Sequence, residues 1–204
     1  MRKINKLVPL PHFNGDNYNR DCRIWSCKNC THITFHNKYS DIYQDTRWQI
    51  LIDEQLQQCG YTELYIENLE DSHIDHYKKR EHFSNLTFDW NNLIVATKDN
   101  DFGANHKDNH YKIEKNEYND IFNPIDDHVE DYFYYLEWGE IREDKGKVQK
   151  TIKIFNLNHE YLQERRKKLI TLIDIYRSGG LSIDEIKDTL ELSGFKSVVE
   201  QYCA

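Results

Sequence analysis

The chain has 204 residues and a formal net charge of −8, with 38% of its residues hydrophobic and 30% charged. No apolar run approaches the roughly 20 residues that a membrane span needs. No stretch near the N-terminus is apolar enough for a secretory signal, so we expect a cytoplasmic protein with no membrane contact. The negative charge has the wrong sign for holding nucleic acid unaided, because phosphate affinity comes mainly from Lys and Arg.

The first predicted element is a helix over residues 45–58, with Asp45 or Thr46 as its N-cap and the turn at Gly60 as its end. The chain length and the patterns that follow predict a single α+β domain over 1–204. The apolar residues that define the helix recur at spacings of three and four: Trp48, Leu51, Ile52 and Leu56.

A ββα-metal core is expected over residues 59–115. Residues 72–77 read as a short strand, and the apolar, β-branched run 93–97 is a second strand beyond a loop. The segment that follows carries His106 and His110 at positions i and i+4, which lie on one face if the segment is helical. Strand, loop, strand and helix closing on one ion form the ββα-metal layout.

A β-hairpin and helices are expected in the C-terminal half. Within the hairpin region 116–158, residues 132–138 and 151–155 predict two strands around a charged turn at Gly146. Residues 159–204 are expected to be mostly helical, because glycines and a serine cap punctuate apolar stripes there. The predicted C-terminal helices cover two ranges: 158–176 and 183–192.

The pair Asp75-His76 is the first candidate for chemistry. A histidine whose ordinary pKa is about 6.5 can accept a proton from water at neutral pH, which makes His76 the candidate general base. Its other ring nitrogen needs an orienting acceptor, which the side-chain carbonyl of Asn92, or of its neighbour Asn91, can supply. A solitary histidine is usually structural, but here an acid, an asparagine and a second histidine follow one another in order.

Asp75 is also the candidate first ligand of a divalent cation. Among the candidates for the second ligand, His106 is the first choice, Asp101 the next and His110 the third. Oxygen and imidazole ligands suit Mg²⁺ or Mn²⁺, and such an ion would stabilise charge on a scissile phosphate. Strand alternation places Asp75 and His76 on opposite faces, so one shared site requires a twist or bulge at the strand end.

Three consecutive cations, Lys78, Lys79 and Arg80, begin two residues after His76. Their position makes them candidate groups for binding the phosphates of nucleic acid. A solvated surface run is the alternative interpretation, and it stays open. Together these residues predict a metal-dependent phosphodiesterase of the HNH type.

The cysteines, at positions 22, 27, 30, 59 and 203, are odd in number. In a chain without a secretory signal this favours reduced thiols over disulfides. A structural zinc site is the alternative, because Cys27 and Cys30 have knuckle spacing, although no second close pair completes it. The candidate zinc ligands would be the first four cysteines: Cys22, Cys27, Cys30 and Cys59.

Several segments form a combined pattern. They read Ile-Leu-Ile-Asp-Glu-Gln at 50–55, Cys-Gly-Tyr-Thr-Glu at 59–63, Ile-Asp-His-Tyr-Lys-Lys at 74–79, Asp-Trp-Asn-Asn-Leu at 89–93 and Thr-Ile-Lys-Ile-Phe-Asn-Leu-Asn at 151–158. The pattern resembles a bacterial HNH endonuclease family that includes the nuclease subunit of Septu-type anti-phage systems, also found beside some retrons. That family reads roughly Leu-Leu-x-Glu-Gln, Cys-x-Tyr-Cys-Glu, Ile-Glu-His-Phe-x-Pro-Lys, Asp-Trp-x-Asn-Leu and Cys-x-x-Cys-Asn.

The chain departs from this family near the candidate site. Many members carry two Cys-x-x-Cys knuckles, whereas the corresponding positions here are Cys59, Thr62, Thr97 and Asn100, so a zinc clamp is not expected there. In the same register Asp101 stands where the family has the asparagine after its last cysteine. This correspondence supports Asp101 as a metal candidate.

The resemblance implies nucleic-acid cleavage in bacterial immunity together with an ABC-type ATPase that senses infection. DNA is the first choice of substrate and RNA the alternative, and a retron reverse transcriptase with its DNA is a further expected partner. A contribution of the partner to nucleic-acid binding agrees with the acidic charge of this chain. The competing interpretation is a catalytically decayed HNH-like module that binds the ATPase or nucleic acid without cleaving.

Overall fold

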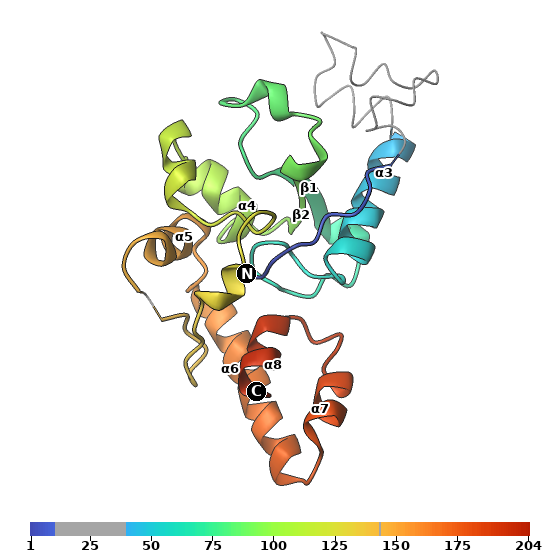
Figure 1. Ribbon diagram of the computed structural model, residues 1–204, viewed down its shortest axis with the longest axis vertical. Coiled ribbons are helices and arrows are strands. Elements are labelled where there is room, and N and C mark those ends of the chain that lie inside the picture. Colours follow the sequence, from blue (N-terminus) through green and yellow to red (C-terminus); the bar gives the residue numbers. More distant parts are fainter. Residues whose placement is uncertain (11–39, 143) are drawn as a thin grey trace.

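A small two-stranded antiparallel sheet lies among helices in the computed structural model, which describes residues 1–10, 40–142 and 144–204 (Figure 1). One sheet with several helices confirms the predicted α+β class. Of the candidate zinc ligands, Cys22, Cys27 and Cys30 lie outside the described residues, and Cys59 is a buried free thiol. The helices and strands have these bounds: α3 Ser40–Gln49, a π-helical segment Ile50–Glu54, β1 Ser72–His76, β2 Leu93–Thr97, α4 Gly103–Asn105, a π-helical segment His106–Tyr111, α5 Lys147–Phe155, α6 Glu160–Ser178, α7 Ile183–Thr189 and α8 Lys196–Tyr202.

Strands β1 and β2 form where the sequence predicted them. They pair antiparallel, with Asp75 opposite Ile94 and His76 opposite Leu93. The outer edge of β2 is covered by the buried amide of Gln55, which accepts from the Val95 N–H at 2.9 Å and donates to the Val95 carbonyl at 2.8 Å. This side chain therefore takes the place of a third strand at an edge that would otherwise leave backbone groups unpaired.

Short 3₁₀ turns connect the elements: Leu69–Asp71, Ser84–Leu86, Trp90–Asn92, Lys115–Asp120 and Val129–Asp131.

The predicted helix over 45–58 is wrong at both ends. Helix α3 begins at Ser40, so Asp45 and Thr46 lie inside it and neither is its N-cap. The helical path ends after the π-helical segment, because Leu56 and the following residue adopt left-handed backbone conformations. Trp48 is 52% exposed, so the predicted apolar face is only partly a buried face.

The predicted hairpin is also wrong, because its second strand is helix α5. Buried Val148, Ile152 and Phe155 recur at helical spacings and pack one face of α5 into the core. Gly146, with φ +83°, precedes the helix, and the left-handed Asn156 ends it. In the first predicted strand, residues 132–138, the β pairing among the described residues is an isolated bridge between residues 135 and 141.

The C-terminal helices α6 and α7 lie close to their predicted ranges. Ser182 caps α7 in a capping box with Glu185, each side chain accepting from the other's backbone N–H. A third helix, α8, was not predicted, and it lies alongside α6 (Figure 1). None of the helices in the described ranges is long and apolar enough to cross a membrane.

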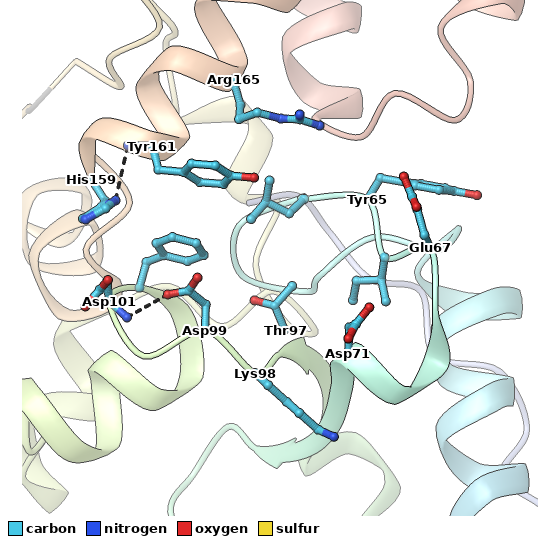
Figure 2. Close-up of a pocket in the computed structure, with 13 residues that line it drawn as sticks. Tyr65, Glu67, Asp71, Thr97, Lys98, Asp99, Asp101, His159, Tyr161 and Arg165 are labelled. Carbon is cyan, nitrogen blue, oxygen red and sulfur yellow. Dashed lines mark hydrogen bonds between the residues drawn. The ribbon is translucent and has the colours of Figure 1, made fainter.

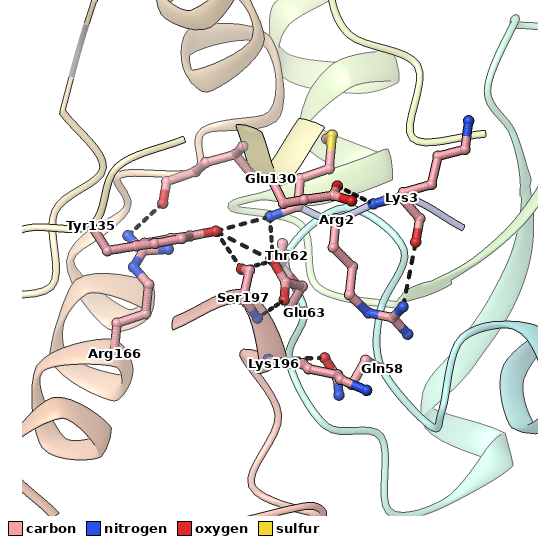
Figure 3. Close-up of polar contacts among 12 residues, drawn as sticks. Arg2, Lys3, Gln58, Thr62, Glu63, Glu130, Tyr135, Arg166, Lys196 and Ser197 are labelled. Carbon is pink, nitrogen blue, oxygen red and sulfur yellow. Dashed lines mark hydrogen bonds and ion pairs between the residues drawn. The ribbon is translucent and has the colours of Figure 1, made fainter. Parts of the chain in front are cut away.

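A buried carboxylate, that of Glu63, ties the chain start to α8 (Figure 3). Its Oε1 accepts from the Met1 ammonium at 2.6 Å and from the Ser197 hydroxyl at 2.5 Å. Its Oε2 accepts from the Ser197 N–H at 2.9 Å. Burial works to raise the pKa of Glu63, but the ammonium and these hydrogen bonds outweigh it and lower the pKa to about 2.

We expect Glu63→Gln to lower the free energy of unfolding at neutral pH by about 3 kcal/mol, because it leaves the buried Met1 ammonium uncompensated. The depressed pKa of Glu63 contributes stability that is present above pH 4.5 and is lost as the pH falls towards about 2. Urea titrations across that range should therefore show that the free energy of unfolding depends less on pH in the variant than in the wild type. The exposed Glu67→Gln is the matched control, and equal slopes for wild type and Glu63→Gln would contradict the assignment.

Candidate functional site

The end of β1, the loop after it and the helical segment beyond α4 enclose a cavity of ≈ 560 Å³, which we call the β1 cavity. Asp75 and His76 both line it, although they are neighbours on one strand. Two cations, Lys79 and Arg80, line it as well. The pair and part of the basic run therefore line one cavity, whereas the later histidine that the hypothesis also required, His106, lines a different pocket. The other lining residues are His73, Ile74, Glu81, Asn105, Asp108 and Asn109.

His76 is held by a backbone carbonyl. Its Nε2 lies 2.7 Å from the carbonyl oxygen of Thr87, and its ring is nearly buried. When Nε2 carries the proton and donates to this carbonyl, Nδ1 is the basic nitrogen of the ring. The loop backbone at Thr87 thus makes the contact that was predicted for Asn92.

Asn92 instead fixes the loop that follows β1. Its Oδ1 accepts from the Lys78 N–H at 2.8 Å, and its Nδ2 donates to the carbonyls of Lys78 and Leu86, both at 3.1 Å. These three bonds bridge the start and the middle of the loop that carries Thr87. Asn92 is therefore a positioning residue, and it acts on the loop backbone where the prediction had it acting on the ring of His76.

Asp75 is bound to a buried lysine that the sequence analysis did not single out. Its Oδ2 accepts from the Tyr61 hydroxyl at 2.5 Å and from the Lys107 Nζ at 3.0 Å. The same ammonium donates to the carbonyl oxygens of His76 at 3.0 Å and Tyr77 at 3.2 Å. Lys107 is fully buried, and its Nζ also lies 3.3 Å from Oδ1 of Asp108.

The charges of Asp75 and Lys107 stabilise each other, whereas the charge of Asp75 opposes a charge on Asp108. Burial works to raise the pKa of Asp75, but the Lys107 ammonium outweighs it and holds the pKa below its usual value. Burial likewise opposes the charge of Lys107, yet Asp75 and Asp108 raise its pKa above the ordinary value. Burial and the charge of Asp75 raise the pKa of Asp108. The ammonium and the Asp75 carboxylate are thus both ionised at neutral pH.

The predicted metal ligands do not converge, because they line three different pockets. Asp101 lies in a pocket of ≈ 650 Å³, where its N–H donates to Asp99 (Figure 2). His106 and His110 stack on each other in another pocket of ≈ 740 Å³, and His106 Nδ1 lies 2.9 Å from the Ile154 carbonyl oxygen. Within residues 1–10, 40–142 and 144–204, no group of three His, Cys, Asp or Glu side chains could hold a metal ion. The predicted set of Asp75, Asp101 and His106 is therefore not a single site.

The helical segment explains why these residues separate. Asn105, Asp108 and Asn109 face the β1 cavity, whereas His106 and His110 face α5. The spacing of three and four among the first three was readable in the sequence as one polar face. Nothing local could say which face would pack against β1.

The basic run divides in a similar way. Lys79 and Arg80 line the β1 cavity, and Lys79 forms an ion pair with Glu81 at 3.0 Å. The Lys78 ammonium lies over the ring of Phe83, 5.6 Å from its centroid. Two of the three predicted phosphate-binding cations therefore face the cavity.

Cys59 and Thr97, which the family register places at knuckle positions, are in contact, with the Thr97 hydroxyl 3.8 Å from the Cys59 sulfur. A comparison with protein-family models gives no match to this chain, and a comparison with curated proteins gives none either.

We expect Asn92→Ala to lower the free energy of unfolding by about 2 kcal/mol, because it leaves partly buried backbone groups of the loop without partners. Amide exchange at Lys78, whose N–H donates to Asn92, should accelerate. The neighbouring exposed residue provides the control, since Asn91→Ala should change stability by less than about 0.5 kcal/mol. Similar exchange rates in both variants would remove the positioning role of Asn92.

Proposed function

We propose that this chain hydrolyses phosphodiester bonds of nucleic acid, with His76 as the general base. The observation that carries the proposal is the β1 cavity, which His76, Lys79 and Arg80 all line. The imidazole can accept a proton from the attacking water, and the two cations can bind the phosphate. Strand β1, strand β2 and the helical segment beyond α4 supply the order of elements expected of a ββα core.

Transition-state charge is the main demand of this reaction. The attack of water on a phosphodiester places added negative charge on the phosphate oxygens, which fixed cations stabilise without reorganising. Lys79 and Arg80 are the cavity's two cations outside the buried cluster, and Arg80 makes no ion pair within the described parts of the chain. Arg80 is therefore the group we assign to the phosphate, with Lys79 supporting it.

Mg²⁺ or Mn²⁺ is the cofactor that the resemblance implies, and the donors of the β1 cavity test its fit. Asp75 commits Oδ2 to Tyr61 and Lys107. The side chain that reaches Asp75 from the helical segment is an ammonium, which repels a cation, where an oxygen or imidazole ligand was expected. The donors present do not fit the expected ion, and no step of the proposed hydrolysis is assigned to one.

The partner proposal follows from the charge of the chain and from the resemblance. A net charge of −8 with a local basic cavity suits a subunit whose partner contributes to nucleic-acid binding. We propose an ABC-type ATPase as that partner, in bacterial anti-phage defence, with DNA as the first substrate to test and RNA as the second. A retron reverse transcriptase with its DNA is the further partner to test.

A second function is favoured by the ion pair between Asp75 and Lys107. A buried carboxylate whose charge is balanced by a lysine does not play the metal-binding role expected of Asp75 in an HNH site. The corresponding role is a non-catalytic module that docks the ATPase or nucleic acid through the same basic cavity. Cleavage assays separate the two functions.

We expect His76→Ala to lower the rate of nucleic-acid cleavage by at least about 100-fold, because the general base is lost. The assay uses plasmid DNA and total RNA, each with and without the ATPase, in buffers with Mn²⁺ or with EDTA. His128→Ala is the control, since His128 is 68% exposed and lies away from the β1 cavity.

Full cleavage by His76→Ala would show that His76 is not the general base. Binding without any cleavage by the wild-type protein would favour the docking module instead.

A further inference from the structure

We infer that the Lys107 ammonium is a built-in cation that takes the place of a divalent metal ion beside Asp75. It acts as a positioning residue for the His76 segment. The inference rests on the proposed site, but its test measures Mn²⁺ binding and thermal stability. Its outcome is therefore independent of whether the chain cleaves nucleic acid.

The surroundings of the ammonium resemble a ligand shell. Four oxygens lie within 3.3 Å of Nζ, from Asp75 Oδ2, the carbonyls of His76 and Tyr77, and Asp108 Oδ1. A carboxylate oxygen and backbone carbonyls are also the oxygen donors that hard cations use in proteins. Lys107 is fully buried, so its head group cannot reach a substrate and can act only through the residues that it holds.

The position in the fold is the one where a metal ligand was expected. Asp75 comes from β1 and Lys107 from the helical segment that packs against the strand, which are the two elements expected to hold the ion. The fold therefore brings β1 and the helical segment together as expected, but the positive charge between them belongs to the Lys107 side chain and not to a bound ion. The other expected ligands face different pockets, so they do not compete for this position.

The charge balance shows what removal of the ammonium would do. Two carboxylates, Asp75 and Asp108, face one lysine, and Asp108 Oδ1 is buried without a hydrogen bond. Without the ammonium, the buried Asp75 and the half-buried Asp108 would lie close to each other with no compensating charge, which is unfavourable. Such a pair would either take up a proton or attract a cation from solution.

The position of His76 depends on the same ammonium. Its hydrogen bonds to the carbonyls of His76 and Tyr77 fix the backbone at the end of β1, from which the imidazole projects. The Thr87 carbonyl fixes the ring from the other side of the loop. The base is thus positioned with no ion required, and Asp75 serves to hold Lys107.

The test compares Mn²⁺ binding and thermal stability of the full chain in the wild type, Lys107→Asn, and Lys107→Asn combined with Asp75→Asn. We expect Mn²⁺ to leave the wild-type Tm unchanged. Lys107→Asn should lower the Tm by several degrees, and Mn²⁺ should recover most of that loss. Calorimetry should show at least tenfold tighter Mn²⁺ binding to this variant than to the wild type, and the second substitution should abolish the gain.

Lys115→Asn, at an exposed position, is the matched control and should resemble the wild type. If Lys107→Asn does not fold alone, refolding in Mn²⁺ and in EDTA provides the same comparison. A comparison of Mn²⁺ binding by the wild type and by Asp75→Asn requires no Lys107 variant. Mn²⁺ binding by the wild type that Asp75→Asn removes, or no gain of Mn²⁺ affinity in Lys107→Asn, would overturn the inference.

Discussion

A single buried ammonium joins the parts of the candidate site. Lys107 reaches from the helical segment to the end of β1 and binds one carboxylate and two backbone carbonyls there. A two-stranded sheet is marginally stable by itself, so the geometry at the end of β1 must come from what packs against it. Breaking a buried pair by removing one partner costs about 3–5 kcal/mol, far more than a surface ion pair contributes. The positions of His76 and of the loop behind it therefore depend on this contact.

One short stretch connects this cluster to the rest of the molecule. Tyr61 donates its hydroxyl to Asp75 and stacks on Phe155 of α5, with ring centroids 4.6 Å apart. Two residues later, Glu63 binds the Met1 ammonium and Ser197 of α8. Two buried ionic clusters thus share one backbone segment. Tyr61 and Glu63, which anchor the two clusters, are only two residues apart in the chain.

The sequence predicted what is local and failed where packing decides. Both strands were placed correctly, and β2 is an apolar run with three β-branched residues between polar turns. Residues 151–155 also contain three β-branched side chains and were mistaken for a strand, although the buried positions from Val148 to Phe155 follow helical spacing. The pair Asp75-His76 was located, but its partner was not. An ordinary lysine between two histidines gives no local sign that it will be buried against a carboxylate. Only the packing of the helical segment on β1 selects Lys107 over His106.

The choice of a lysine over a metal ion has a chemical consequence. A bound divalent ion can contact the phosphate directly and act as a Lewis acid, whereas a fully buried ammonium can only organise the groups around it. If the β1 cavity is catalytic, the developing charge must then be stabilised by its solvent-facing cations, Lys79 and Arg80. Lys79 already shares its charge with Glu81, at 3.0 Å, so most of this demand falls on Arg80. The guanidinium has a fork of donors that matches a phosphate and keeps its charge at any physiological pH. In the proposed site the two cations would have different roles: Lys107 holds the end of β1 that carries the proposed base, and Arg80 is the cation available to bind the phosphate.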